Sequence, residues 1–300
     1  MHSGFVAILG RPNVGKSTLL NAIVGTKVSI TSSRPNTTRF GVRGVLHRDG
    51  AQAVFVDTPG LHRPRSALGG RLNDRAVGTL RDVDVVVAVL DATAPVGPGD
   101  RMVLSSAVSA LADPDATGGL LVAVNKLDRA RPNQVLERLT EASAAVDALA
   151  AGRAEAVVEG AQYFPVSAMS GEGVDGLLDA VLAQLPEGPA YFPPDMVSDL
   201  PEAIAVAELV REQLLVRARD ELPHSIACMV TEWEWPRIRC EILVERESQK
   251  GIVIGAGGEV LKAVGTAVRA QLPEGAYLEL FVRVEPRWQQ RPESLDRLGY

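Results

Sequence analysis

The sequence predicts an α/β protein in which a doubly wound domain with a mostly parallel sheet precedes a smaller α+β domain. The first part of the chain alternates helical stretches with apolar runs that lack period-two alternation, as strands covered on both faces do. Residues 185–201 then contain five prolines, which is typical of an extended, semi-rigid linker. Beyond them, apolar and polar residues alternate along short runs, as in strands with one covered face. We therefore expect domains at residues 1–185 and 202–286, a linker at 186–201 and a tail at 287–300.

The first domain is expected to begin with a strand and to continue as alternating strands and helices. Apolar runs predict strands at 5–9, 53–56, 83–90, 120–124 and 163–166, and Phe40 to Leu46 is expected to be an edge strand. Helices are expected at residues 17–24, near 134–151 and at 174–185. In a sheet of this kind, ligands bind at the carboxyl ends of the strands.

The second domain is expected to run helix, strand, strand, glycine-rich loop with a helix, and strand. Its strands are predicted at 226–230, 238–244 and 278–284, where apolar residues alternate. Helical spacing marks two apolar stripes, Ala207, Val210, Leu214 and Ala218 in the first helix, and Val260, Val264, Val268 and Leu272 in the second. The glycine-rich loop that precedes the second helix is Gly255-Ala256-Gly257-Gly258.

Composition and charge give no sign of a nucleic-acid-binding, membrane-spanning or secreted protein. The formal net charge of −6 gives no global basic excess that would indicate nucleic-acid binding, and the 46% hydrophobic content supports well-formed cores. No apolar run approaches the length of a membrane span, and no signal peptide is expected because the first strand begins at Phe5. Cys228 and Cys240 lie on apolar strand faces, so core packing in a reducing cytosol is expected. The histidines show no metal-ligand spacing.

The strongest motif follows the first strand and matches G-x-x-x-x-G-K-[ST], a loop that wraps nucleotide phosphates. Its glycines let the backbone turn so that successive N–H groups point at phosphate oxygens, and the following helix directs its positive end at the anion. Lys16 would place its charge on the β- and γ-phosphates, and the Ser17 hydroxyl would bind Mg²⁺. The expected phosphate-binding residues are Gly10, Arg11, Pro12, Asn13, Val14, Gly15, Lys16, Ser17 and Thr18.

A second motif, Asn125-Lys126-Leu127-Asp128, follows an apolar strand and predicts that the base is guanine. The Asp128 carboxylate can accept hydrogen bonds from guanine N1–H and N2–H₂, whereas adenine would leave this charge unmatched. Asn125 would tie the loop to the phosphate loop, and the stem of Lys126 would cover the base. A further loop, Ser167-Ala168-Met169, would direct the Ala168 N–H at guanine O6.

Two segments between these motifs are expected to respond to the γ-phosphate. Asp57 would hold Mg²⁺ through water, and the Gly60 N–H would reach the γ-phosphate. Thr38 is our choice for the second hydroxyl ligand of Mg²⁺, with Thr37 as the rival. We call them switch segments: the first is Asn36, Thr37, Thr38, Arg39 and Phe40, and the second is Asp57, Thr58, Pro59, Gly60 and Leu61.

The order of these motifs resembles that of the translation-factor branch of GTPases, and the whole chain resembles the Era family more closely. In the second half, the resemblance lies in the stretch from Ile242 to Gly255, in Glu221 to Ser225 and in the ending Leu298-Gly299-Tyr300. It implies a Ras-like P-loop G domain followed by a type II KH domain, which binds RNA at a G-x-x-G loop. The RNA contacts implied are Lys250, Gly255, Ala256, Gly257, Gly258 and Lys262.

The sequence of the glycine-rich loop differs from the family pattern at a position that matters for RNA binding. Family members usually carry a polar or basic residue between the glycines, where this chain has Ala256. From Leu200 to Tyr300 there are 13 Lys and Arg against 16 Asp and Glu, a balance of −3. Contacts to RNA phosphates therefore require a local patch of basic side chains, for which the candidates are Arg246, Lys250, Lys262 and Arg269. The alternative is that these four are ordinary solvated surface charges.

The resemblance implies a GTP-hydrolysing switch that binds 16S ribosomal RNA near its 3′ end and assists assembly of the 30S subunit. Its ligands would be GTP, GDP and Mg²⁺. It would be cytoplasmic with peripheral contact to the inner face of the cell membrane, and no oligomer is expected. The alternative is a GTP-dependent scaffold for RNA or protein in which hydrolysis is vestigial.

Leu61 favours slow intrinsic turnover, because many GTPases place glutamine there to orient the attacking water. His62, the next residue, is a less favoured candidate for a base. Related GTPases with asparagine at the position of Asn13 bind a potassium ion that supplies positive charge in catalysis. Asn13 would therefore either hold K⁺ or only brace the phosphate loop.

Overall fold

The computed structural model describes the chain except for residues 33, 35–36, 62–65, 113–117, 150–158 and 218–224. The predicted positions Asn36, His62 and Ala218 and the stretch 221–224 lie outside the described residues. Two compact units are present, one of Met1–Thr31, Thr38–Arg63 and Leu72–Asp199, the other of Ser32–Thr37, Pro64–Arg71 and Leu200–Tyr300.

The first unit is built on a six-stranded sheet with the strand order β2-β3-β1-β4-β5-β6. Only the edge strand β2 is antiparallel to its neighbour, and all other pairs are parallel, which confirms the predicted doubly wound α/β class. The strands are β1 His2–Gly10, β2 Val42–Arg48, β3 Ala51–Asp57, β4 Val85–Asp91, β5 Leu120–Asn125 and β6 Gln162–Val166.

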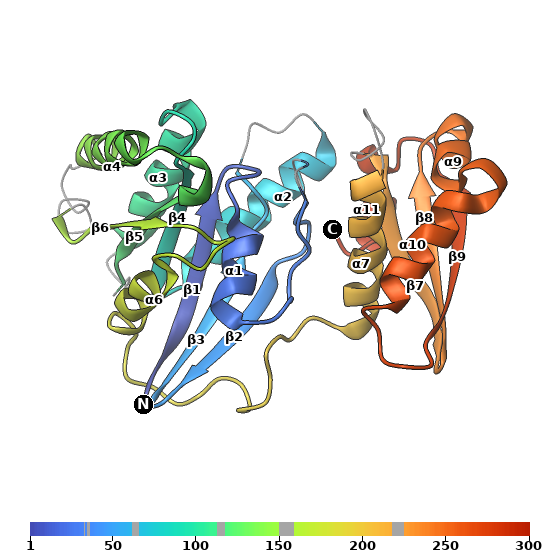
Figure 1. The fold of residues 1–300 in the computed structure, drawn as a ribbon, viewed down its shortest axis with the longest axis horizontal. Coiled ribbons are helices and arrows are strands. Elements are labelled where there is room, and N and C mark those ends of the chain that lie inside the picture. Colours follow the sequence, from blue (N-terminus) through green and yellow to red (C-terminus); the bar gives the residue numbers. More distant parts are fainter. Residues whose placement is uncertain (33, 35–36, 62–65, 113–117, 150–158, 218–224) are drawn as a thin grey trace. The chain divides into compact units, whose positions relative to one another are not determined.

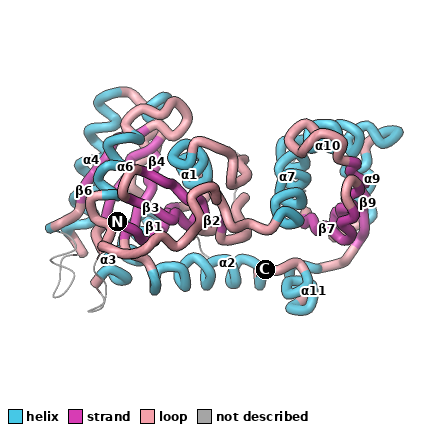
Figure 2. The backbone as a smooth tube through the Cα atoms, turned by 90° about the horizontal axis from the view of Figure 1, so that it is seen from below, coloured by secondary structure: helices cyan, strands magenta, loops and turns pink. Residues whose placement is uncertain are grey.

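Helices cover both faces of this sheet (Figure 1). They are α1 Lys16–Val24, α3 Pro98–Leu111, α4 Pro132–Asp147, α6 Val174–Leu182 and the part of α2 Ala67–Gly78 that begins at Leu72, with short 3₁₀ turns η1 Thr79–Asp82 and η2 Leu127–Arg129. In Figure 2, α1 and α3 lie on opposite sides of β1 and β3. Successive residues of a strand point to opposite faces, so Ala7 and Leu9 join the cluster that contains Val103 and Leu104 of α3.

The helix and strand boundaries differ from the predicted ones by a few residues. The helix α4 begins at Pro132 rather than near residue 134, because proline is favoured at the first helical position, where its missing N–H is not needed. The helix α6 ends at Leu182 rather than at Leu185. The edge strand begins at Val42, two residues after Phe40, and extends to Arg48.

The proline-rich segment that follows α6 is hydrogen-bonded to the edge strand β2 and to its neighbour β3. The buried Gln52 side chain accepts bonds from the N–H groups of Tyr191 and Phe192 (2.7 and 3.1 Å) and donates to the Phe192 carbonyl at 2.8 Å. Farther along, the N–H of Val45 on β2 donates to the Val197 carbonyl at 2.9 Å. This pairing covers part of an edge that a sheet would otherwise expose.

The second unit is built on a three-stranded sheet with the order β7-β8-β9. The pair β7 and β8 is antiparallel, whereas β8 and β9 are parallel. The predicted order of elements omits one helix, α9, which lies before the glycine-rich loop. The elements are α7 Glu202–Arg217, β7 Ala227–Glu234, β8 Arg237–Val244, α9 Glu247–Ile254, η3 Ala256–Gly258, α10 Glu259–Arg269, β9 Tyr277–Val284, η4 Trp288–Gln290 and α11 Pro292–Arg297.

One apolar core joins the two longer helices of this unit to the sheet. Val210 of α7, Val264 of α10 and Ile242 of β8 are fully buried in it. Cys228 and Cys240 are both free and buried there, which confirms the expectation of core packing. The tail is also fixed, because the buried Trp288 indole N–H donates to the Ser225 carbonyl at 2.9 Å.

Within the described part of the chain, no single helix has the length and apolar composition needed to cross a membrane. Taken together, the bent helices Glu247–Ile254 and Ala256–Arg269, which meet at 41°, meet those criteria by length and composition only. The described residues also contain no group of three or more His, Cys, Asp or Glu side chains arranged to hold a metal ion.

Candidate functional site

The predicted phosphate loop connects β1 to α1 and is shaped by close backbone approaches. Gly15, the residue before α1, has a φ of 99°, and a Cβ added there would lie 2.3 Å from Nδ2 of Asn125. A Cβ on Gly10 would lie 2.7 Å from the Val89 carbonyl oxygen. Both positions therefore need glycine, and Asn13 adopts a positive φ of 66° between them.

Lys16 is buried at the start of α1. Its Nζ donates to the carbonyls of Gly10 and Arg11, each at 3.1 Å. Burial lowers the pKa of Lys16 to about 8, and the opposing attraction of Asp57 does not fully compensate. An anion placed before the helix would meet both this ammonium group and the positive end of α1.

Asp57, at the carboxyl end of β3, is the centre of a cluster of hydroxyl groups. Its Oδ2 accepts hydrogen bonds from Ser17 (2.7 Å), Ser29 (2.8 Å) and Thr38 (3.2 Å). Its Oδ1 is buried and has no hydrogen-bond partner. Burial raises the pKa of this carboxyl, against the opposing effects of Lys16 and the three hydroxyls.

This cluster fits a magnesium ion. Mg²⁺ in proteins is bound through one or two carboxylates, hydroxyls, water and substrate phosphates. The hydroxyls of Ser17 and Thr38 lie 2.9 Å apart beside the unpartnered carboxylate oxygen of Asp57, which supplies such a donor set. When bound, Mg²⁺ would neutralise negative charge on the phosphate oxygens.

The two threonines of the first predicted switch segment behave differently. Thr38 reaches Ser17 and Asp57, whereas the Thr37 hydroxyl donates to the Arg34 carbonyl at 2.7 Å. Arg39 is buried, and Phe40 is half-buried. The geometry therefore favours Thr38 over Thr37 as the hydroxyl that can reach a metal ion.

The second predicted switch segment begins at the carboxyl end of β3 and reaches the phosphate loop, where the Leu61 N–H donates to the Gly10 carbonyl at 3.2 Å. The Thr58 hydroxyl donates to the Ile8 carbonyl at 2.8 Å, and Pro59 is buried. A Cβ on Gly60 would lie 2.7 Å from the Pro12 nitrogen, so glycine is required for this approach. The Leu61 side chain is only 4% exposed and belongs to the apolar core, so it takes no part in orienting a water molecule.

The two motifs expected to bind guanine are joined by hydrogen bonds. Asn125 donates from Nδ2 to the Val14 carbonyl at 2.8 Å and accepts at Oδ1 from the Ala168 N–H at 2.9 Å. Asp128 accepts at Oδ1 from the Ser167 hydroxyl at 2.7 Å. The structure thus brings the loop at 125–128, the loop at 167–169 and the phosphate loop together at one end of the sheet, with Met169 exposed.

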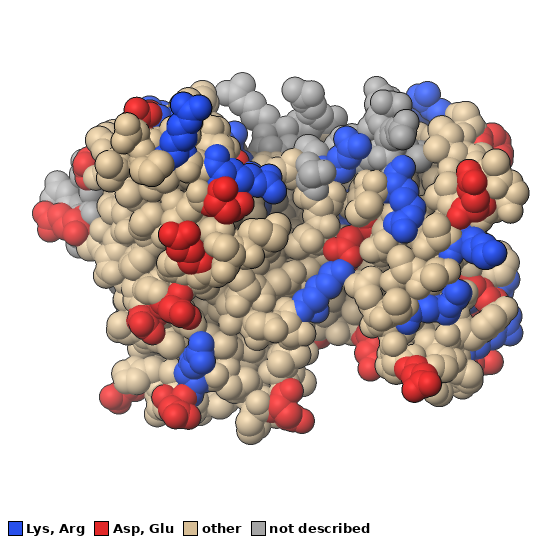
Figure 3. All heavy atoms as spheres, in the orientation of Figure 1, with Lys and Arg blue, Asp and Glu red and all other residues tan. Residues whose placement is uncertain are grey.

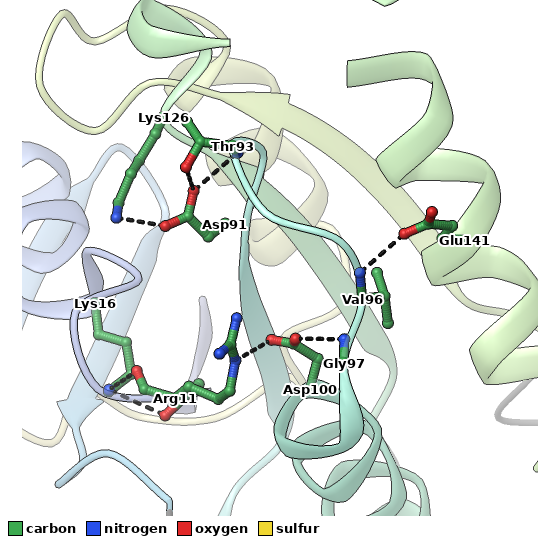
Figure 4. A network of polar contacts seen from close by, with 10 residues as sticks. Arg11, Lys16, Asp91, Thr93, Val96, Gly97, Asp100, Lys126 and Glu141 are labelled. Carbon is green, nitrogen blue, oxygen red and sulfur yellow. Dashed lines mark hydrogen bonds and ion pairs between the residues drawn. The ribbon is translucent and has the colours of Figure 1, made fainter. Parts of the chain in front are cut away.

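Two carboxylates outside the predicted motifs hold basic side chains of the site (Figure 4). Asp91, at the end of β4, forms an ion pair with Lys126 at 2.6 Å and accepts from the N–H and hydroxyl of Thr93. Asp100 forms an ion pair with Arg11 at 2.6 Å and also accepts from the Gly97 N–H at 2.9 Å.

These two acids, with Ser29 and its neighbour Asn21, are the residues that sequence reasoning missed. Asp91 had a usable signal, because it directly follows an apolar strand whose carboxyl end must face the ligand. Asp100, Ser29 and Asn21 had none. Their roles depend on contacts between segments far apart in the sequence.

The glycine-rich loop of the second unit turns through three positive φ angles, 77° at Gly255, 58° at Gly257 and 81° at Gly258. A Cβ on Gly255 would lie 2.6 Å from Cγ2 of Val260, so this glycine is sterically required. Ala256 is exposed at the tip of the loop.

The predicted basic patch around this loop is sparse. Lys262, Arg246 and Arg269 are exposed, and Lys250 is half-buried. On the face drawn in Figure 3, acidic and basic side chains of the second unit are interspersed rather than separated by sign.

The fold and the site together define a P-loop GTP-binding protein with a second, KH-type unit. The sequence profile described as a 50S ribosome-binding GTPase matches residues 5–126, and a KH domain profile matches residues 221–289. GTPase Era of Mycobacterium bovis is 46% identical over 311 residues, covering 100% of this chain and 99% of that protein. GTPase Era of Mycobacterium avium is 46% identical over 310 residues, covering 99% and 98%. The chain therefore belongs to the Era family of GTPases, as its motifs predicted.

Solved structures agree with this assignment. A crystal structure of Era with MgGDPNP and nucleotides 1506–1542 of 16S ribosomal RNA matches with a TM-score of 0.90 and 37% identity, covering 100% of this chain and 99% of that one. A variant of Aquifex aeolicus Era bound to GDP and AlF₄⁻ matches with a TM-score of 0.88 at 37% identity, with the same coverage. The predicted enzyme class, a GTPase, is confirmed by this membership.

Proposed function

We propose that the protein is a GTP-hydrolysing switch that binds 16S ribosomal RNA near its 3′ end and assists maturation of the 30S subunit. The observation that carries this proposal is a likeness over the whole chain, at a TM-score of 0.90, to an Era structure that holds both MgGDPNP and a 16S fragment. Both halves needed for such a switch, a P-loop unit and a KH-type unit, are present.

Within the first unit we assign three roles. Backbone N–H groups of residues 10–18 and the Lys16 ammonium bind the phosphates. Ser17 and Thr38 bind Mg²⁺ directly, and Asp57 binds it through water. Asp128 selects guanine, Lys126 covers the base and Asn125 holds the loops together. The Ala168 N–H donates to O6 once guanine is bound, which requires that it leave or share its acceptor in this structure, Asn125 Oδ1.

In the GTP state, the segments at 36–40 and 57–61 are expected to be ordered by the γ-phosphate and Mg²⁺, and hydrolysis releases them. Because Leu61 is buried in the core, the residue that orients the attacking water lies elsewhere, and intrinsic turnover is slow. Lys16→Ala abolishes phosphate binding and thereby turnover.

We propose that RNA lies along Gly255–Gly258, flanked by Lys250 and Lys262. The exposed tip at Ala256 allows a sugar–phosphate chain to approach the backbone closely, and the N-terminus of α10 follows directly. Since the surrounding charge is not positive, base contacts must supply much of the affinity.

The experiment is a pull-down of RNA by the full chain loaded with GDPNP or GDP, followed by sequencing. We expect enrichment of the 3′ region of 16S RNA that depends on the nucleotide. Recovery of tRNA, or of no RNA in either state, contradicts the ribosomal role and leaves the GTPase assignment standing.

We also propose that K⁺ binds beside Asn13 and supplies positive charge during hydrolysis. Asn13 stands in the phosphate loop with a positive φ of 66°. Single-turnover hydrolysis in potassium is expected to be faster than in sodium, and Asn13→Ala should remove the difference. Equal rates in the two salts would exclude the ion and leave Asn13 as a brace for the loop.

The family resemblance leads us to propose a cytoplasmic protein with peripheral contact to the inner face of the cell membrane. Flotation with anionic vesicles tests this contact. Protein that stays at the bottom of the gradient at physiological salt contradicts it.

A further inference from the structure

One hydroxyl of the Asp57 cluster belongs to none of the predicted motifs. The Ser29 Oγ donates to Asp57 Oδ2 at 2.8 Å, and the residue is only 2% exposed. It lies five residues after the end of α1, before the first predicted switch segment.

The backbone of Ser29 is held by a side chain of α1. Asn21 accepts at Oδ1 from the N–H groups of Val28 (3.0 Å) and Ser29 (2.9 Å), and its Nδ2 donates to the Ser29 carbonyl at 2.8 Å. Two of these hydrogen bonds fix the backbone of Ser29, and the third fixes that of Val28, to the helix that begins with Lys16 and Ser17. The position of its hydroxyl is therefore tied to the phosphate-binding end of the unit.

The three hydroxyls on Asp57 are not equivalent. Ser17 and Thr38 also contact each other at 2.9 Å and are the expected ligands of Mg²⁺, whereas Ser29 contacts Asn21 and Asp57. All three bond to Oδ2, which leaves the buried Oδ1 without a hydrogen-bond partner. A carboxylate held at one oxygen presents the other oxygen to a metal-bound water in a fixed direction.

We propose that Ser29 is a positioning residue that orients the Asp57 carboxylate toward the hydration shell of Mg²⁺, and that it matters most in the GDP state. In GTPases, the segment that carries Thr38 is ordered by the γ-phosphate and released after hydrolysis. With Thr38 withdrawn, Ser17 and Ser29 are the two remaining donors of the cluster. Removal of Ser29 then takes one of two hydrogen bonds rather than one of three.

The experiment measures the affinity of the nucleotide-loaded full chain for Mn²⁺ by electron paramagnetic resonance, since Mn²⁺ accepts the same oxygen ligands. In Ser29→Ala the Mn²⁺ affinity of the GDP complex is expected to fall about tenfold, the lower end of the effect of removing an outer-shell partner. In the GDPNP complex the loss is expected to be smaller, because the hydroxyls of Ser17 and Thr38 both still hold Asp57.

Three comparisons make the result decisive. Ser29→Thr keeps the hydroxyl and should retain most of the affinity, and Asn21→Ala should weaken Mn²⁺ binding in the same direction. Ser106→Ala removes a hydroxyl that donates to the Met102 carbonyl on α3, and it should leave the Mn²⁺ affinity unchanged.

Nucleotide dissociation in EDTA should be equal in Ser29→Ala and the wild type, because Ser29 acts through the metal.

The proposal is overturned by any of three results. One is a wild-type affinity of the GDP complex for Mn²⁺ no greater than that of GDP alone. Another is an unchanged affinity in Ser29→Ala. The third is faster nucleotide release from Ser29→Ala in EDTA, since a merely structural role would loosen the site with or without a metal.

Discussion

At the scale of single residues, the nucleotide site depends on carboxylates held in one orientation by neighbouring donors. Asp128 accepts at Oδ1 from the Ser167 hydroxyl at 2.7 Å, and its Oδ2 lies 3.5 Å from Nε of Arg129 in an ion pair. Asp57 receives three hydroxyls at one oxygen. Since a fixed carboxylate rejects a mismatched base more strongly than a mobile one, we expect Ser167 to increase guanine selectivity through Asp128.

The first prediction concerns the base. In Asp128→Asn, the amide loses the match to the guanine N2 amine but can match a carbonyl at that position, so preference should move from GTP toward xanthosine triphosphate. The expected loss of GTP affinity is about 3 kcal/mol, or more than a hundredfold. Competition between the two nucleotides measures it, with Ser167→Ala as a control that should weaken GTP without gaining xanthosine affinity. An unchanged preference would show that Asp128 does not contact the base.

The second prediction concerns Asp91, which fixes the Lys126 ammonium. Burial alone would raise the pKa of Asp91, but hydrogen bonds from Lys126 and Thr93 outweigh it and lower the pKa, so the carboxylate is charged at neutral pH. Asp91→Asn should release Lys126 and weaken GDP binding by about 1 kcal/mol, or roughly fivefold.

A double-mutant cycle separates this role from a general loosening of the site. Asp91→Asn and Lys126→Met should be strongly non-additive for GDP affinity, because they remove the same contact. Asp100→Asn, which affects Arg11 instead, should be additive with Lys126→Met. Additivity in both cycles would contradict a positioning role for Asp91.

At the scale of helices and strands, the sequence predicts those elements whose position depends on the spacing of apolar residues or on the conformations that only glycine adopts. The parallel strands and the loops at their carboxyl ends follow from uninterrupted apolar runs, and the phosphate loop follows from glycines that close contacts require. The helix α9 was missed because its eight residues include Gly251 and carry no clear apolar stripe.

Contacts between distant segments were beyond prediction for a different reason. The bonds between Gln52 and residues 191–192 join parts of the chain about 140 positions apart. Neither segment has a sequence pattern that indicates the other as its contact partner. Ser29 illustrates the same limit within the site. Its contact with Asp57 spans 28 positions, and a serine in a loop rich in hydroxyl residues is compatible with many roles.

The third prediction belongs to the C-terminal elements. Burial alone would raise the pKa of Glu285, but hydrogen bonds from Ser294 and Arg297 of α11 outweigh it and lower the pKa. A carboxyl with a lowered pKa in the folded state stabilises the fold above its unfolded pKa and loses that effect as the pH falls through the folded value.

The stability of the second unit should therefore decrease by about 1 kcal/mol between pH 5 and pH 3 through this group. Urea unfolding followed by tryptophan fluorescence reports on this unit alone, because Trp233, Trp235 and Trp288 are the three tryptophans of the chain. Ser294→Ala should lower the stability at pH 7 and flatten the decrease. An equally steep decrease in that variant would contradict the assignment to Glu285.

At the scale of the whole molecule, the charge distribution limits how the protein can hold RNA. The chain carries a net charge of −6, and residues 200–300 carry 13 basic against 16 acidic side chains. A protein that neutralises many phosphates releases many counterions and binds with a steep salt dependence. Here only Lys250 and Lys262 flank the exposed loop at Ala256 in the predicted contact set.

The last prediction follows from this charge balance. With about two phosphate contacts to a single strand, the logarithm of RNA affinity should fall against the logarithm of salt concentration with a slope of about −1.4. Titration of a 16S 3′-terminal fragment between low and physiological salt measures the slope. Ala256→Lys adds one cation at the tip of the loop, so affinity should rise and the slope should steepen by about 0.7, while Ala256→Gln, its uncharged control, should leave the slope unchanged. A wild-type slope steeper than about −4 would mean that RNA binds a basic surface other than the Gly255–Gly258 loop.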